Sequence, residues 1–153
     1  MSRLSPLQNA HKKGLFGDCQ EKNENNLLKI REITDVKIYQ VVQYKKSSVS
    51  ANNIQLGSVN LPTQAAEVSA DEQTRIQWFA PRSWIVFSND NNISSAIENT
   101  FNDQDFAVTD ISHSRAIIQI KGKDALNVLK KGCPINFNEM KKLLPLLLLI
   151  LIG

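Results

Sequence analysis

Two β-favouring runs follow each other in the stretch Arg75-Ile76-Gln77-Trp78-Phe79-Ala80-Pro81-Arg82-Ser83-Trp84-Ile85-Val86-Phe87. Aromatic and β-branched side chains fit the pleated, half-buried surface of a sheet, so residues 75–79 and 84–87 are expected to be strands. The link 80–83 has hairpin length, and Pro81 fixes a backbone angle suited to a turn. The stretch therefore predicts an antiparallel hairpin.

A helix is expected directly after this hairpin. Asp90 and the asparagines after it are good N-cap residues. Apolar side chains then recur at helical spacing, at Ile93, Ala96, Ile97 and Phe101. Two further β-type runs, 107–111 and 116–120, come next.

A second helix is expected to open at Gly122, with Asp124 in its first turn and Gly132 as its stop. Its expected packing face consists of apolar residues: Ala125, Leu126, Val128 and Leu129.

On the N-terminal side, residues 28–44 predict one or two strands. A short helical turn is expected to end at Gly57, and Pro62 marks a connector. Strand pairs separated by single helices predict an α+β fold with a mostly antiparallel sheet and helices packed on one face. We expect residues 1–27 to be an N-terminal arm, 28–138 the α+β domain and 139–153 an atypical apolar tail.

Composition excludes several classes of protein. The chain has 153 residues, 42% of them apolar, and a net charge of +3, which is within the globular range. Two cysteines, Cys19 and Cys133, form neither a disulfide framework nor a metal-ligand pattern, so a cytoplasmic protein is expected. The closing apolar block 143–152 is about half the roughly 20 residues of a membrane-spanning helix.

Charge alternates along the chain. The net charge is +4 over residues 1–46, −6 over 47–110 and +5 over 111–153. This pattern suits docking on partner proteins better than tracking a nucleic acid, which favours one dominant basic face. The alternative is that these charges only solvate the surface.

The one clustered polar set lies at residues 110–115. One interpretation makes His113 a base oriented by Asp110, with Ser112 or Ser114 as nucleophile. The favoured interpretation is structural: Asp110 accepts hydrogen bonds from the turn backbone and from Arg115 and so fixes a hairpin. No phosphate-binding glycine motif occurs in the sequence.

Other candidate residues also have two interpretations. Trp78 and Trp84 could stack a pteridine or a base, but aromatic residues flanking a hairpin favour the core. His11 is expected to have no ligand partner, and Cys133 is expected to be a buried structural thiol. We therefore predict no catalytic, cofactor-binding or metal-binding residue.

Several short stretches together resemble the gamma subunit of heterotetrameric sarcosine oxidase. Their order and spacing extend up to about Asn138. They are Ser5-Pro6-Leu7, Leu61-Pro62, 78–86, 108–115, 120–125 and Lys131-Gly132-Cys133-Pro134-Ile135.

The resemblance implies a non-catalytic subunit related to the folate-binding domain of the glycine-cleavage T-protein. Its partners would be the alpha, beta and delta subunits, with no nucleic acid and no membrane. FAD, FMN, NAD, tetrahydrofolate and zinc would belong to those other subunits, and none to this chain. The complex would oxidise sarcosine to glycine, with the methyl carbon passed to tetrahydrofolate or released as formaldehyde and hydrogen peroxide formed.

The C-terminus departs from the family pattern after residue 138. The closing block lacks the alternation of a half-exposed strand and the polar face of a surface helix, so we expect no regular element there. Our hypothesis is a reading-frame slip near Lys141-Lys142 or a truncation there.

Two other functions stay open from the sequence alone. One is a stand-alone folate-binding protein or aminomethyltransferase-like enzyme of the T-protein superfamily. The other is a small nucleic-acid-binding module that uses the basic ends of the chain.

Overall fold

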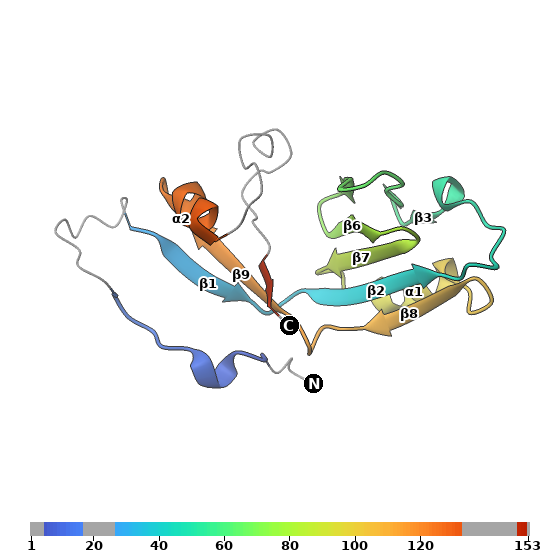
Figure 1. The fold of residues 1–153 in the computed structure, drawn as a ribbon. Helices are drawn as coiled ribbons and strands as arrows, with labels where there is room; N and C mark the ends of the chain where they lie inside the picture. The colour runs from blue at the N-terminus through green and yellow to red at the C-terminus, as the bar shows by residue number, and fades with distance from the viewer. Residues whose placement is uncertain (1–4, 17–26, 133–149, 153) are drawn as a thin grey trace. The chain divides into compact units, whose positions relative to one another are not determined.

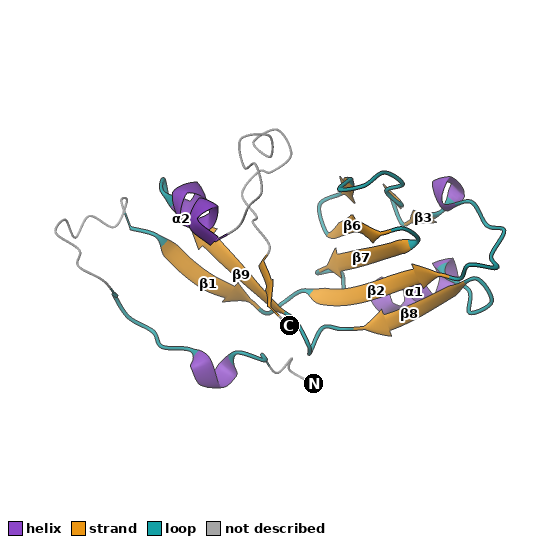
Figure 2. Cartoon of the chain, viewed as in Figure 1, coloured by secondary structure: helices purple, strands orange, loops and turns teal. Residues whose placement is uncertain are grey.

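The computed structural model describes residues 5–16, 27–132 and 150–152. The chain forms two compact units, one over Asp35–Ser114 and one over Ser2–Thr34 with Arg115–Gly153 (Figure 1). Strands, drawn orange in Figure 2, carry most of the regular structure of both units. The predicted α+β class with mostly antiparallel pairing is confirmed. The predicted boundaries at residues 27 and 138 stay a prediction.

The unit Asp35–Ser114 is built on a five-stranded antiparallel sheet. Its strand order is β5-β6-β7-β2-β8, so β2 lies at the interior and β5 and β8 form the edges. The strands are β2 (Lys37–Gln43), β5 (Val68–Ala70), β6 (Thr74–Ala80), β7 (Ser83–Ser88) and β8 (Phe106–Asp110).

One face of this sheet carries the core of the unit. The helix α1 (Ile93–Thr100) supplies Ile93 and Ile97, and Phe101 follows it; each is 2% exposed, as the helical spacing predicted. The rings of Phe101 and Phe106 meet edge to face, with centroids 5.2 Å apart. The short 3-10 helix η2 (Ala51–Asn53) and the strands β3 (Gln55–Leu56) and β4 (Val59–Asn60) complete the unit. Burial of this apolar set holds α1 on the sheet.

The predicted hairpin is present as β6 and β7. Trp78 pairs with Trp84, and the two-residue loop places Pro81 before Arg82, whose φ is +61°. Proline followed by a positive φ is the pattern of a type II turn. Trp84 is buried and donates its indole N–H to the Pro62 carbonyl at 2.7 Å, whereas Trp78 is only half-buried. The core interpretation therefore holds for Trp84.

The second unit has a three-stranded antiparallel sheet of order β1-β9-β10. It contains the 3-10 helix η1 (Gln8–Ala10), β1 (Lys29–Ile33), β9 (Ala116–Lys121), α2 (Ala125–Gly132) and β10 (Ile150–Ile152). Arg31 on β1 donates its Nε to the Gln119 side-chain oxygen on β9 at 2.6 Å. Residues adjacent in the sheet are thus far apart in the sequence.

Residues 110–115 do not close a hairpin, which corrects the prediction. The strands on either side, β8 and β9, pair with β2 and with β1, and they belong to different sheets. Local strand runs do not reveal their partners, and consecutive strands can separate into different sheets. The fold therefore has separate sheets where the sequence predicted one.

Three smaller predictions were also wrong. Gly57 does not end a helical turn; it sits in the loop between β3 and β4 with φ +61°, where a two-residue hairpin accepts glycine. Val128 is 40% exposed, so it lies outside the buried stripe of α2, whose buried residue is Leu129. The closing block does contain a regular element, because β10 pairs with β9. An apolar run needs no alternation to be a strand.

We expect Trp84→Phe to lower the free energy of unfolding by about 1–3 kcal/mol, because the buried Pro62 carbonyl loses its donor. Urea unfolding followed by circular dichroism measures this. Trp78→Phe, in the paired and less buried position, is the matched control. An equal loss in both variants would contradict the role of the indole hydrogen bond.

We expect Asp71→Asn to destabilise the protein in a pH-dependent way. The Ser58 hydroxyl and the Thr74 and Gln73 amides donate to Asp71 and hold its pKa below the ordinary 3.8. A carboxylate whose pKa is lower in the folded state stabilises the fold above its unfolded pKa, here about the ordinary 3.8. This stabilisation is lost as the pH falls through the folded pKa. The difference from wild type should be full at pH 7 and shrink below pH 3.8. Glu72→Gln is the control, and a pH-independent difference for Asp71→Asn would count against this account.

Candidate functional site

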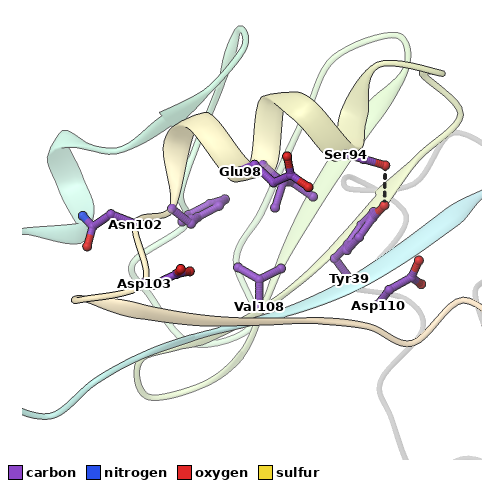
Figure 3. A pocket seen from close by; sticks show the side chains of 9 residues that line it. Tyr39, Ser94, Glu98, Asn102, Asp103, Val108 and Asp110 are labelled. Atoms are coloured by element: carbon purple, nitrogen blue, oxygen red, sulfur yellow. Dashed lines mark hydrogen bonds between the residues drawn. The ribbon is translucent and has the colours of Figure 1, made fainter.

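A pocket of about 710 Å³ lies between α1 and the strands β2 and β8 (Figure 3). This volume is in the range of small-ligand sites, roughly 300–1,000 Å³. Its walls are formed by residues from α1, from the loop after it and from the two strands. They are Tyr39, Ser94, Ile97, Glu98, Phe101, Asn102, Asp103, Val108 and Asp110.

Helical and strand periodicity explain which side chains reach this pocket. Ile93 and Ile97 of α1 point into the core. Ser94 and Glu98 each follow one of these residues in the sequence, so their side chains lie on the side of the helix next to the buried face. Val108 and Asp110, two residues apart on β8, share the face that looks toward the helix. The pocket is thus a direct product of the packing of α1 on the sheet.

A hydrogen bond fixes one wall of the pocket. The Tyr39 hydroxyl and the Ser94 hydroxyl are 2.8 Å apart, shown by the dashed line in Figure 3. Lys37 Nζ donates to the same Ser94 oxygen at 3.1 Å. These contacts tie the start of α1 to β2.

The pocket is acidic. Glu98, Asp103 and Asp110 are exposed carboxylates, and none of the nine described lining residues is basic. The segment with net charge −6 in the sequence is the one that supplies them. Among the described residues, three carboxylates outnumber the one ammonium at the pocket wall, that of Lys37, so the net charge attracts cations and repels anions. The site therefore favours a cationic group over an anionic one.

The predicted polar set at residues 110–115 holds the backbone in place. Asp110 Oδ1 accepts the Ser112 amide at 2.8 Å, which confirms that Asp110 binds the turn backbone. Ser112 Oγ accepts the Ile38 amide at 2.8 Å, and Ser114 Oγ donates to the Ile111 carbonyl at 3.1 Å. His113 is exposed. The contact of Asp110 with Arg115 stays a prediction.

The structure brings together one set of residues that the sequence analysis missed. His11 Nε2 lies 2.8 Å from Glu32 Oε2, a contact that the sequence did not predict. The Ser5 hydroxyl lies 2.7 and 2.6 Å from the two oxygens of the same carboxylate, which is only 2% exposed. Both groups contact Glu32, whereas a catalytic relay needs the serine against the histidine. The set therefore ties the N-terminal segment to β1, and no local spacing predicts a contact across this separation.

No cluster of three or more potential metal ligands occurs among residues 5–16, 27–132 and 150–152. Within that same part of the chain, no helix has the length and apolar character that crossing a membrane requires. Cys19 and Cys133 lie outside the described residues.

Comparison with known proteins finds similarity both in sequence and in fold. No family model matches it. It is 28% identical over 78 residues to the sarcosine oxidase subunit gamma of Corynebacterium sp. (strain U-96), a match that covers 50% of this chain and 38% of the relative. The resemblance found in the sequence is thereby confirmed.

Solved structures give two further similarities. Heterotetrameric sarcosine oxidase from Corynebacterium sp. U-96, in complex with pyrrole 2-carboxylate, matches with a TM-score of 0.64 and 21% identity, over 75% of this chain and 60% of that chain. The glycine cleavage system aminomethyltransferase T from Bartonella henselae matches with a TM-score of 0.44 and 16% identity, over 75% and 34%. The matches span less than two thirds of the length of these proteins, and the first shows a shared fold.

We expect Ser112→Ala to lower the free energy of unfolding by about 1–3 kcal/mol, because the buried Ile38 amide loses its acceptor. Ser114→Ala, on an exposed residue of the same turn, should change it by no more than about 0.5 kcal/mol. Chemical denaturation of both variants measures the difference. Equal values would show that the Ser112 bridge does not stabilise the unit.

Proposed function

We propose that this chain is a structural subunit, of the gamma type, in a heterotetrameric sarcosine oxidase. The observation that carries the proposal is that sequence and fold similarity lead to the same complex. The curated relative is a sarcosine oxidase subunit gamma, and the solved structure with a TM-score of 0.64 is a heterotetrameric sarcosine oxidase.

The charge distribution supports an assembly role. The unit Asp35–Ser114 has nine acidic and five basic side chains, a net charge of −4, while the remainder of the chain has six acidic and thirteen basic, a net charge of +7. Segments of opposite net charge steer association and select partners by complementary charge. A subunit that contacts several other chains benefits from having segments of both signs.

The finer parts of the proposal concern the complex as a whole. Its partners would be alpha, beta and delta subunits in the cytoplasm. Those subunits would carry FAD, FMN, NAD, tetrahydrofolate and zinc. The reaction would convert sarcosine to glycine, with the methyl carbon transferred to tetrahydrofolate or released as formaldehyde, and with hydrogen peroxide as a product. This chain would contribute assembly and no catalytic residue.

A stand-alone folate-binding function comes second. The pocket volume suits a small ligand, but Glu98, Asp103 and Asp110 would repel the carboxylates of a folate. The acidic unit likewise opposes nucleic acid, whose phosphates would have to bind elsewhere on the chain.

The test is co-expression of the tagged chain with the alpha, beta and delta subunits from the same source. We expect all four chains to co-elute in gel filtration at a fixed ratio, and omission of this chain to lower the yield of the assembled complex. Co-expression with the subunits of an unrelated complex is the control. A chain that elutes alone, or that binds tetrahydrofolate alone, would contradict the proposal.

A further inference from the structure

The strand β8 leaves one backbone edge open. The Ile111 amide donates to the Ile38 carbonyl, and the Tyr44 amide donates to the Asp105 carbonyl. With the register of β8 against β2, these two bonds show which residues of β8 direct their backbone N–H and C=O groups toward β2. In an antiparallel pair these alternate with residues whose N–H and C=O point outward. Val108 and Asp110 therefore direct their amides and carbonyls away from the sheet, while the Phe106 amide bonds to the Asn102 carbonyl.

This edge has no backbone obstacle to pairing, and its only charged side chain is that of Asp110. Edge strands are commonly protected by proline, lysine, a bulge or a covering element. The strand Phe106–Asp110 contains no proline and no lysine, and its register with β2 runs without a shift. No described strand pairs with its outer side. An extended segment could add to the sheet here through main-chain hydrogen bonds.

The acidic pocket lies beside the same edge. Val108 and Asp110 contribute both to the open edge and to the pocket wall, and Glu98 and Asp103 face the same space (Figure 3). A strand added beside β8 places every second side chain on the face that carries α1. Those alternate side chains would approach three carboxylates, which complement positive charge.

We propose that β8 pairs with an extended segment of a partner polypeptide that carries Lys or Arg at alternate positions, with these side chains over the acidic pocket. The proposal deepens the subunit role and rests on it for the identity of the partner, which is another subunit of the complex. Backbone pairing provides affinity, and the alternating charge provides register and specificity.

The first test uses three short capped peptides with the full chain. One alternates Lys with Thr, one has the same composition with all Lys before all Thr, and one alternates Glu with Thr. We expect the alternating basic peptide to bind at least about tenfold more tightly than either control, because only it combines charge with strand periodicity. Equal affinity of the two basic peptides would reduce the effect to nonspecific electrostatics and overturn the proposal.

Variants separate the backbone contribution from the charge contribution. Val108→Pro removes an outward N–H without removing a bond to β2, so it should weaken peptide binding about tenfold or more. The double variant Glu98→Lys with Asp103→Lys should also weaken peptide binding about tenfold or more. Neither residue lies in a strand, so this variant leaves the sheet residues unchanged. Asp35→Lys with Glu72→Lys changes the total charge equally at exposed sites away from the pocket, and should leave binding within about twofold. Equal loss in the two charge-reversal pairs would overturn the proposal, even if Val108→Pro failed to fold.

Hydrogen exchange of backbone amides in the co-purified complex shows whether the partner binds at the β8 edge or at another surface of the chain. The amide protons of Val108 and Asp110 should exchange more slowly in the complex than in the isolated chain. A complex that forms while these two amides exchange at unchanged rates would overturn the docking surface and leave the subunit role standing. If no complex forms, the subunit role fails and the peptide titration alone decides the edge pairing. Self-association of the chain that protects these amides would assign the edge to a second copy and contradict the proposal.

Discussion

The pairing of β2 with two strands at once is the constraint on which the larger unit depends. β2 pairs with β7 on one side and β8 on the other, and Ile38 and Val41 within it are fully buried. This pairing joins the hairpin of residues 74–88 to residues 106–110, and α1 covers the joint. The pocket exists because Tyr39 on β2 is held opposite Asp110 on β8 beside α1. The Ser112 hydroxyl extends the same connection by bonding to the Ile38 amide.

Features set by neighbours in the sequence could be predicted. The β6–β7 hairpin follows from two apolar runs around Pro81, and α1 follows from the spacing of Ile93, Ile97 and Phe101, because turn chemistry and periodicity act over a few residues. The partners of each strand could not be predicted in this way. β9 pairs with β1, which lies near the other end of the chain. Which strands pair depends on contacts between distant parts of the chain in the folded protein. The contact between His11 and Glu32 was missed for the same reason.

The candidate site was predictable in its charge and not in its place. The segment 47–110 has a net charge of −6, so an acidic surface in this part of the chain was expected from composition. The pocket appears only when α1 crosses β2 and β8, which brings Glu98, Asp103 and Asp110 around one space. The polar cluster visible in the sequence lies at 110–115, and only the fold gives Asp110 a second role at the pocket. A polar cluster in a sequence identifies polar residues, and the fold determines which of them meet.

The carboxylates beside β8 also bear on which partner the edge can accept. Two copies of β8 placed edge to edge would bring the Asp110 side chains and their acidic surroundings together, and like charges at close range in a sheet are destabilising. The same carboxylates stabilise a strand with basic side chains at alternate positions. One set of charges therefore disfavours pairing between identical copies and favours pairing with a complementary chain, which is how specificity is obtained from both attraction and repulsion. An open edge of this kind is a hazard in a free monomer and an advantage in a subunit whose partner covers it.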